Sequence, residues 1–454
     1  MSSHPCAAII LAAGKGTRMK SALPKVLHPI AGRPMLAHVL DAVTVLEPVL
    51  QVVVVAPDME QVATAVASVP TAVQPKALGT ADAVKAAREA LGSFADGSVF
   101  ILNGDTPFIR AETLAAMRAR RATGAGIVVL GMRPRDPSGY GRLVLNDSGQ
   151  VTAIVEDRDA DDEVRRIDLC NSGVMAVDAS ALFSLLDAIG NDNAKGEYYL
   201  TDIVAIGRDR GLSCVVVEAP EEELLGVDSR ADLANAEALW QAQRRSVMMD
   251  AGVSLTAPET VWFSYDTRVG ADVTIGQNVV IAPGVTIEDG AEIRPFSHLE
   301  GAHVGKDSVI GPYARLRPGT SIGANARVGN FVEIKNTELG DGAKANHLTY
   351  LGDSTIGGAT NIGAGTITCN YDGYLKHRTE IGQGVFIGSN VALVAPVRVG
   401  DGAVVGAGSV VSSDVGSDAV ALARGEQVER AGAAVRYREK RAALKAGGKT
   451  GGKG

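Results

Sequence analysis

The apolar positions divide the chain into two parts with different periods. In the first part, short β-branched apolar runs alternate with longer alanine-rich segments of helical spacing. Fully apolar strands joined by helices are typical of a largely parallel sheet that is covered on both faces. The expected strands are 7–12, 52–56, 99–102 and 127–130, and the expected helices include 81–91 and 112–121. Ligands of such sheets bind beyond the carboxyl ends of the strands, so we expect functional residues there.

The second part has a period of six residues. Aliphatic residues recur at every sixth position in three ladders, from Val269 to Leu299, from Val304 to Ile334 and from Ile381 to Val411, and glycine often follows them. An α-helix cannot support a sustained six-residue period. A triangular β-solenoid can, because each side is a short strand with one inward aliphatic side chain. The pattern therefore predicts a hexapeptide β-helix.

A helix is predicted between the two parts, because Ser229 can cap it together with Asp232, and Leu233, Ala236 and Trp240 fall on one face. The end of the chain is basic and Gly/Lys-rich, too poor in apolar residues to form a core. The expected organisation is an α/β domain at 1–228, a linker helix at 229–249, a β-helix domain at 250–424 and a largely disordered tail at 425–454.

Composition narrows the functional classes. The formal net charge of -8 argues against nucleic-acid binding. No apolar run approaches the ~20 residues of a membrane-spanning helix. The four cysteines are scattered without a C-x-x-C pair, which argues against a disulfide framework or a zinc knuckle and favours a reducing compartment. We therefore expect a cytoplasmic protein that binds neither nucleic acid nor a membrane.

The first candidate site follows the first strand. Gly14-Lys-Gly16 lacks the third glycine of a dinucleotide fingerprint and does not match a P-loop. With Arg18 and Lys25, however, the loop offers backbone N–H groups and two cations to a polyphosphate. Asp105, at the end of the predicted strand 99–102, is placed to hold a hard cation such as Mg²⁺. The alternative is that Asp105 only caps the following helix.

The second candidate site lies where the repeat breaks. Residues 369–380 fit no hexapeptide phase and must leave the solenoid as a loop. Just before them, His347 occupies a polar turn region, where a histidine can act as a base near neutral pH. A histidine in such a position can also be an ordinary surface residue.

Several longer motifs carry a resemblance to known families. Leu11-Ala-Ala-Gly-Lys-Gly-Thr-Arg-Met19, followed by Pro24-Lys25, is similar to the nucleoside-triphosphate sugar-1-phosphate nucleotidyltransferases. The segments Gly196-Glu-Tyr-Tyr-Leu-Thr-Asp202, Gly329-Asn-Phe-Val-Glu-Ile-Lys335 and His347-Leu-Thr-Tyr-Leu-Gly352 extend the likeness. Apart from the last thirty or so residues, the chain resembles the family of bifunctional N-acetylglucosamine-1-phosphate uridylyltransferase/glucosamine-1-phosphate N-acetyltransferases.

The resemblance implies a Rossmann-like domain with a mostly parallel sheet, followed by a left-handed parallel β-helix. It also implies two reactions. Acetyl-CoA acetylates glucosamine-1-phosphate in the C-terminal domain, and UTP with Mg²⁺ then converts N-acetylglucosamine-1-phosphate to UDP-N-acetylglucosamine and pyrophosphate in the N-terminal domain. The implied assembly is a homotrimer through the β-helix, with the acetyl-CoA site shared between neighbours.

For uridylyl transfer, the resemblance implies catalytic roles for Arg18 and Lys25. The implied nucleotide-binding residues are Leu11, Ala12, Ala13, Gly14, Lys25, Gln74, Gly79, Thr80 and Asn103. The implied sugar-phosphate residues are Gly141, Glu156, Asn171 and Asp228, and the metal ligands are Asp105 and Asp228. The family usually has asparagine where this chain has Asp228. A carboxylate is still a hard oxygen donor, so we expect Mg²⁺ to be retained, unless Asp228 only caps the linker helix.

For acetyl transfer, the resemblance implies His347 as the general base. The implied sugar-phosphate residues are Arg317, Lys335, Tyr350, Asn361 and Lys376, and the acetyl-CoA residues are Ala364, Asn370, Tyr371, Ser389, Ala407 and Arg424. Two other functions stay open at this point: a monofunctional nucleotidyltransferase whose β-helix is only a trimerisation stalk, and a non-enzymatic scaffold.

Overall fold

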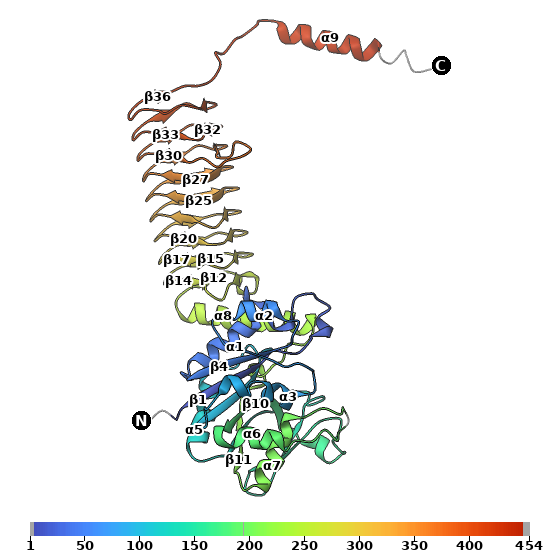
Figure 1. Cartoon of the computed structure of the whole chain (residues 1–454). Coiled ribbons are helices and arrows are strands. Elements are labelled where there is room, and N and C mark those ends of the chain that lie inside the picture. Colours follow the sequence, from blue (N-terminus) through green and yellow to red (C-terminus); the bar gives the residue numbers. More distant parts are fainter. Residues whose placement is uncertain (1–3, 194, 448–454) are drawn as a thin grey trace, which may run out of the picture. The chain divides into compact units, whose positions relative to one another are not determined.

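The computed structural model describes residues 4–193 and 195–447, and its contacts divide the chain into two units (Figure 1). The first unit comprises Met1–Asp250 and Trp262–Thr267. The second comprises Ala251–Val261 and Arg268–Gly454. Each unit has its own core and is described separately.

The first unit is built on a mixed sheet with strand order β11-β7-β10-β6-β1-β4-β5, in which only β10 runs antiparallel to its neighbours on this path. The expected strands are all present. The bounds are β1 Cys6–Leu11, β4 Leu50–Val55, β5 Thr71–Val73, β6 Ser98–Asn103, β7 Ile127–Met132, β10 Cys170–Asp178 and β11 Cys214–Glu218. In addition, β8 Arg142–Leu145 pairs with β10, β9 Val151–Val155 pairs with β8, and β2 Pro29–Ile30 and β3 Arg33–Pro34 form a small separate pair.

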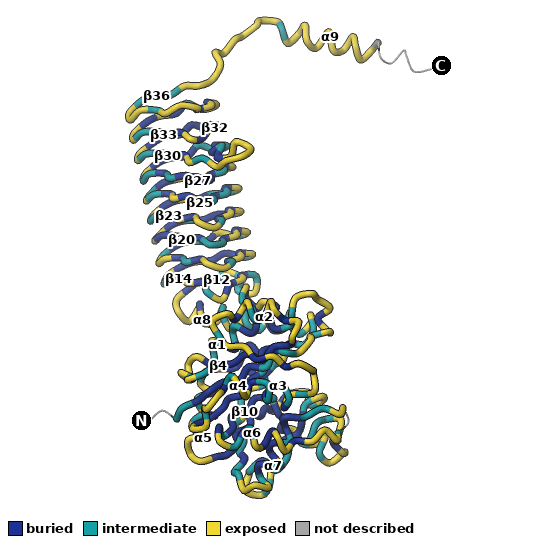
Figure 2. The backbone as a smooth tube through the Cα atoms, viewed as in Figure 1, coloured by how far each residue is buried: buried dark blue, intermediate teal, exposed yellow. Residues whose placement is uncertain are grey.

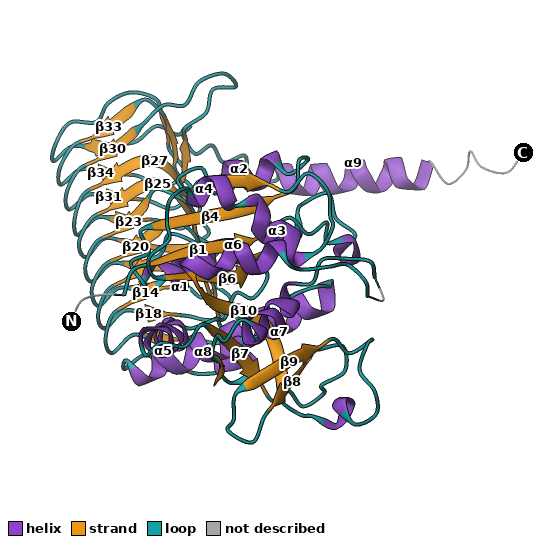
Figure 3. Ribbon diagram, turned by 60° about the horizontal axis from the view of Figure 1, so that its bottom comes forward, coloured by secondary structure: helices purple, strands orange, loops and turns teal. Residues whose placement is uncertain are grey.

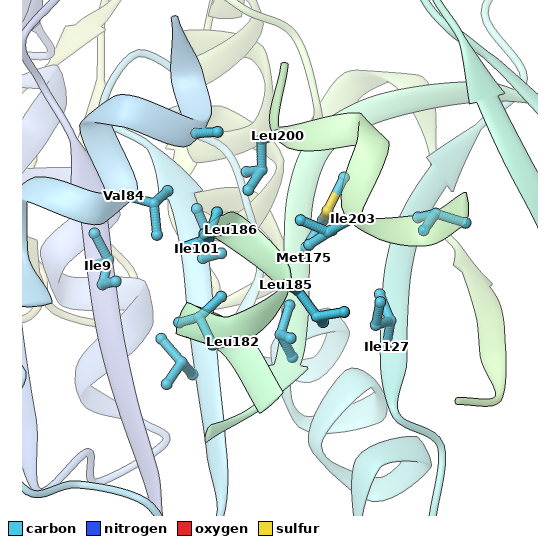
Figure 4. Close-up of a cluster of buried hydrophobic side chains, with 14 of the residues drawn as sticks. Ile9, Val84, Ile101, Ile127, Met175, Leu182, Leu185, Leu186, Leu200 and Ile203 are labelled. Atoms are coloured by element: carbon cyan, nitrogen blue, oxygen red, sulfur yellow. The ribbon is translucent and has the colours of Figure 1, made fainter. Parts of the chain in front are cut away.

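Helices cover both faces of this sheet (Figure 3). Alternate residues of each strand enter two separate cores: Ile9 and Ile101 lie in one, Ile10 and Leu102 in the other. Figure 4 shows the first core, where Leu182, with other residues of α6, packs against the strands. The helices are α1 Met35–Thr44, α2 Glu60–Ala65, α3 Thr80–Ala86, α4 Arg88–Leu91, α5 Ala111–Ala122, α6 Ala179–Asp187, α7 Ile203–Asp209 and α8 Arg230–Asp250.

Two predicted helices show where local sequence succeeds and where it fails. The predicted helix at 81–91 is divided at Ala87 into α3 and α4. The predicted linker helix is α8, and its cap is the expected one. The Asp232 N–H donates to Ser229 Oγ at 3.2 Å, and the Ser229 N–H donates to Asp232 Oδ2 at 2.8 Å. This reciprocal pair satisfies two N–H groups that a helix start leaves without partners.

The second unit is a parallel β-helix whose coils stack through two long sheets of short strands. Ile275 pairs with Ile293, eighteen residues on, so one coil takes about three hexapeptides. The strands are β12 Ser254–Leu255, β13 Trp262–Phe263, β14 Arg268–Val269, β15 Thr274–Ile275, β16 Val280–Ile281, β17 Thr286–Ile287, β18 Glu292–Ile293, β19 His298–Leu299, β20 Ala302–Val304, β21 Val309–Ile310, β22 Arg315–Leu316, β23 Thr320–Ile322, β24 Arg327–Asn330, β25 Glu333–Leu339, β26 Lys344–His347, β27 Tyr350–Ile356, β28 Asn361–Ile362, β29 Ile367–Cys369, β30 Thr379–Ile381, β31 Phe386–Ile387, β32 Ala392–Val394, β33 Val397–Val399, β34 Val404–Val405, β35 Val410–Val411 and β36 Val420–Ala421, with β13 assigned by its contacts to the first unit.

The three aliphatic ladders form the core of this solenoid, as predicted. Every ladder residue is buried except Val269, on the first coil, which is half-buried. Figure 2 shows the consequence: a buried inner lining with an exposed outer surface, and an exposed loop that leaves the coils near β30. In this loop the coil lengthens, because Ile362 pairs with Ile387, twenty-five residues on.

The tail differs from the expectation of general disorder. Residues Ala433–Gly447 form α9, whose residues from Ala434 to Ala446 are all exposed. Alanine, arginine and lysine favour a helix without tertiary support, and the argument from core burial overlooked this local preference. Residues 448–454 of the predicted tail lie outside the described residues.

Candidate active sites

The predicted phosphate-binding loop leaves β1 and is held by close packing against the segment that carries Lys25. Its second glycine, Gly16, has φ +56°, and a Cβ atom there would lie 2.5 Å from Lys25 Cβ. A short 3-10 turn, Thr17–Met19, follows Gly16 directly, and a second one, Lys25–Leu27, begins at Lys25. Glycine is therefore required for the loop to approach the segment that carries Lys25.

One cavity of about 280 Å³ gathers all nine predicted nucleotide-binding residues together with Asp105. Gln74 is fixed in its wall, because its Nε2 donates to Gly79 O at 3.1 Å and to Asp82 Oδ2 at 2.9 Å. Gly79 has φ +117°, and a Cβ there would lie 2.5 Å from Tyr198 O. Lys15 and Glu197 also line the cavity. We did not predict these two, although both lie inside quoted motifs.

A compact group of charges lies beside this cavity. The Lys25 ammonium contacts both Asp105 and Asp228, with 2.8 Å to Asp228 Oδ1, and Arg18 Nη2 lies 2.9 Å from Asp228 Oδ2. Burial disfavours the Lys25 charge, but the two carboxylates outweigh burial and raise the pKa of Lys25. Burial is likewise outweighed at Asp228, whose pKa is lowered by Lys25 and Arg18.

In this structure the side chains of both acids pair with cations. Asp228 uses its side chain on two cations, while the cap of α8 is supplied by Ser229 and Asp232. Asp105 likewise pairs with Lys25. Of the described residues, no three or more His, Cys, Asp or Glu are grouped to hold a metal ion. Mg²⁺ commonly takes one or two carboxylates and completes its shell with water and substrate phosphates, and Asp105 and Asp228 fit that donor set.

A second cavity of about 480 Å³ shares Asn103 and Asp105 with the first and is also lined by Arg18 and Asp228. Of the predicted sugar-phosphate residues only Asp228 lines it, but Gly141 and Asn171 directly follow or precede two lining residues, Tyr140 and Ser172. Asn171 N–H donates to Gly141 O at 2.8 Å, and a Cβ on Gly141 would lie 3.7 Å from Glu156 Cδ. Burial raises the pKa of Glu156, against a hydrogen bond from Thr201 Oγ1 at 3.3 Å.

Arg230 is a site residue that sequence reasoning missed. Its Nε donates to Met19 O at 3.2 Å, and its Nη1 lies 3.3 Å from Nδ1 of the buried His28. Arg230 thus ties the end of the phosphate loop to the first residue of α8. No local signal marks it, because the contact joins segments more than two hundred residues apart.

In the solenoid, two predicted sugar-phosphate residues stand above one another, and a third, Tyr350, lies in the column beside them. Arg317 and Lys335 occupy equivalent positions on successive coils, because Leu316 pairs with Ile334, and Tyr350 pairs with Glu333 beside them. Arg317 Nη1 lies 2.8 Å from Glu333 Oε1. The Lys335 ammonium nearby lowers the pKa of the exposed Lys376. Asn361 lies apart from this group, in the other sheet.

The loop that carries Lys376 is closed by a carboxylate at its centre. Asp372 accepts hydrogen bonds from the N–H groups of Tyr374 and Leu375 at 2.8 and 2.7 Å, and its Oδ2 lies 2.7 Å from His377 Nε2. These contacts lower the pKa of Asp372 to about 2. His377 has no predicted catalytic or binding role, and its contact with Asp372 is a structural one.

His347 lies exposed at a corner of the prism, on the coil that also carries Tyr350. Its Nδ1 lies 2.8 Å from Asn330 Oδ1. When Nδ1 donates this bond, the lone pair is on Nε2, which is the form a base requires.

The structure separates the predicted acetyl-CoA residues into two groups. Ala364, Ser389 and Ala407 follow His347 at equivalent positions on successive coils, and Arg424 Nη1 donates to Ala407 O at 2.7 Å. Asn370 and Tyr371 lie after β29, at the next corner, where the Asn370 side chain contacts Tyr350 and Asp353. The sequence alone did not distinguish these two groups, because spacing does not reveal which corner of a prism a residue occupies.

Comparison with known proteins agrees with both halves. A family model described as a MobA-like NTP transferase domain matches residues 8–168, and the bacterial transferase hexapeptide model matches 266–301, 301–336 and 378–413. None of the described helices has the length and apolar composition needed to cross a membrane.

Full-length relatives identify the family. A protein of Paramagnetospirillum magneticum named bifunctional protein GlmU is 55% identical over 448 residues, which cover 98% of this chain and 99% of that protein. Proteins of the same name from Rhodospirillum rubrum and Sphingopyxis alaskensis are 59% and 55% identical, over 95% and 96% of this chain and 97% of each relative. The monofunctional and scaffold alternatives are therefore set aside, and the chain, with its nucleotidyltransferase domain and its left-handed hexapeptide β-helix, belongs to the bifunctional GlmU family.

Proposed function

We propose that the two sites carry out successive steps of UDP-N-acetylglucosamine synthesis. The β-helix acetylates glucosamine-1-phosphate with acetyl-CoA, and the α/β unit then transfers uridylyl from UTP to N-acetylglucosamine-1-phosphate. The assignment of uridylyl transfer to the α/β unit rests on one cavity. It is lined by all nine predicted nucleotide-binding residues, which include Lys25, and by Asp105, which pairs with Lys25. All four substrates are small phosphorylated molecules, and we place the enzyme in the cytoplasm.

In the α/β unit, the loop 11–14 and Lys25 hold the triphosphate, while Gln74, Gly79 and Thr80 hold the uracil. The sugar phosphate, bound near Glu156 and Asn171, attacks the α-phosphorus in line, and pyrophosphate leaves. Arg18 and Lys25 stabilise the charge that develops on the phosphoryl oxygens, so catalysis rests on positioning and electrostatics. A Mg²⁺ ion held by Asp105 and Asp228 supplies further charge neutralisation when it is bound.

In the β-helix, Arg317, Lys335, Tyr350 and Lys376 hold the phosphate of glucosamine-1-phosphate. His347 Nε2 accepts a proton from the sugar amine as its nitrogen forms a bond to the acetyl carbon. The thioester C–S bond then breaks, and the thiolate of coenzyme A leaves and takes up a proton. Ala364, Ser389, Ala407 and Arg424 line the path of acetyl-CoA along the corner.

We infer a homotrimer through the β-helix, because one copy presents an incomplete acetyl site. The acetyl-CoA residues occupy two different corners of the prism, so a neighbouring copy is needed to bring both kinds of corner to one ligand. An exposed apolar column supports this assembly. Phe296, Tyr313 and Phe331 stack on successive coils with ring centroids 4.9 and 5.2 Å apart, and 46–56% of each residue is exposed. Such surface is normally covered in oligomers.

The two activities are tested by supplying substrates in separate combinations. Glucosamine-1-phosphate and acetyl-CoA without UTP should release free thiol, and N-acetylglucosamine-1-phosphate with UTP and Mg²⁺ should release pyrophosphate. Asp105→Ala should abolish only pyrophosphate release, and His347→Ala only thiol release. Each variant is the control for the other. Full thiol release by His347→Ala, or full pyrophosphate release by Asp105→Ala, would show that the assigned residue is wrong.

A further inference from the structure

A buried carboxylate lies behind the phosphate-binding lysines of the solenoid. Asp353 follows Asn336 and Gly319 in one corner column, and all three have positive φ, at +49°, +46° and +81°. The Asp353 side chain is 11% exposed. On the next coil this corner is the place where the loop of residues 370–378 leaves the prism.

Each oxygen of this carboxylate has a partner on a different coil. Oδ1 accepts a hydrogen bond from Asn336 Nδ2 at 2.7 Å, and Oδ2 accepts one from Asn370 Nδ2 at 2.5 Å. Lys335 Nζ lies 4.0 Å from Oδ2. Burial disfavours the charge of Asp353, but the two amides and the charges of Lys335 and Lys376 outweigh burial and lower its pKa.

This arrangement addresses a difficulty in the proposed phosphate site. Lys335 and Lys376 are like charges that lie close together before any anion binds, and their repulsion favours separation. A fixed negative charge 4.0 Å from the Lys335 ammonium, which also attracts the charge of Lys376, offsets that repulsion. The same carboxylate also holds Asn370, the residue at the base of the loop that carries Lys376.

We propose that Asp353 is a positioning residue of the acetyl-acceptor site, which holds Lys335 and Lys376 side by side so that both ammonium groups meet the phosphate of the sugar. The inference rests on the proposed role of the two lysines. A simple charge argument predicts the opposite change in phosphate binding when Asp353 is removed. If Asp353 only reduced the positive potential, its removal would strengthen binding of the phosphate.

The test uses the full-length protein and the KM for glucosamine-1-phosphate, measured by thiol release at saturating acetyl-CoA. Asp353→Asn should raise KM about tenfold, the order of one lost charge-assisted hydrogen bond, with kcat changed less than threefold. Glu338→Gln is the matched control, because it removes one negative charge from an exposed position of β25. We expect it to leave KM unchanged.

Two further variants separate positioning from a general loss of structure. Asn336→Gly removes one partner of Asp353 but keeps a residue suited to positive φ, so it should raise KM in the same direction. In a Lys335→Met background, Asp353→Asn should have little further effect, because there is then no pair of lysines to hold together. Pyrophosphate release by the α/β unit should stay normal in every variant.

Three results would overturn the inference: a lower or unchanged KM in Asp353→Asn, an unchanged KM in Asn336→Gly, or an undiminished effect of Asp353→Asn beside Lys335→Met. Failure of the proposed function gives a different result. In that case Lys335→Met and Lys376→Met would themselves leave the KM for glucosamine-1-phosphate unchanged.

Discussion

Replacing Gly16 by alanine should damage uridylyl transfer without affecting acetyl transfer. The new Cβ would lie 2.5 Å from Lys25 Cβ, whereas ordinary contacts begin at about 3.4 Å, so one side must move by about 0.9 Å. Alanine at φ +56° also costs about 1–2 kcal/mol. The loop and Lys25 are free to separate because the cavity beside them is open. A misplacement of about 1 Å in a positioning group costs about a hundredfold in rate.

The assay is pyrophosphate release from UTP and N-acetylglucosamine-1-phosphate, with thiol release from acetyl-CoA measured on the same preparation. We expect kcat/KM for uridylyl transfer to fall about a hundredfold and the acetyl reaction to stay within twofold of its original rate. Gly149→Ala is the matched control, because Gly149 has φ +74° and open space around it. It should carry the conformational cost without the loss of activity. Uridylyl transfer within twofold of the original enzyme in Gly16→Ala would refute the reasoning.

Three other predictions concern stability. Burial beside Arg230 lowers the pKa of His28, so the folded state binds fewer protons than the unfolded state, and stability falls as pH drops below about 6.5. The melting temperature should therefore be lower at pH 5.5 than at pH 7.5, and His28→Gln should reduce this difference. Ile293→Ala should lower the free energy of unfolding of the solenoid by about 2–5 kcal/mol in urea titrations, against at most about 0.5 kcal/mol for the exposed Thr274→Ala. Removal of α9 and all that follows should leave the melting temperature within about 1 °C, because α9 side chains are exposed; a larger fall would reveal contacts that a single copy does not make.

The regular parts of the fold were predictable because their physical causes are local or periodic. The aliphatic residue at every sixth position is required by the three-sided coil, so Ile293 and Ile310 could be placed in the core from spacing alone. The cap of α8 by Ser229 and Asp232 depends on residues three apart. Burial of the parallel strands on both faces follows from their unbroken apolar composition.

The parts that could not be predicted depend on contacts between distant segments. The folded sheet brings Arg230 and Met19 together, and no motif near either residue predicts their contact. Asp353 resembles any polar corner residue until the coils above and below supply Asn370 and Asn336. The family resemblance named the residues of the acetyl site, but it did not show that they occupy two corners of the prism.

The stacked corner that begins at His347 also has a length that the fold itself fixes. His347, Ala364, Ser389 and Ala407 mark four consecutive coils, which are separated by three steps of one strand spacing, about 4.8 Å each, so the distance from the first to the last is about 14 Å. That length is set by the number of coils and not by the side chains on them. The length available to an extended ligand along the corner can therefore change only by whole coils. Deleting one complete coil would shorten the corner by one strand spacing and leave the packing of the hydrophobic interior unchanged.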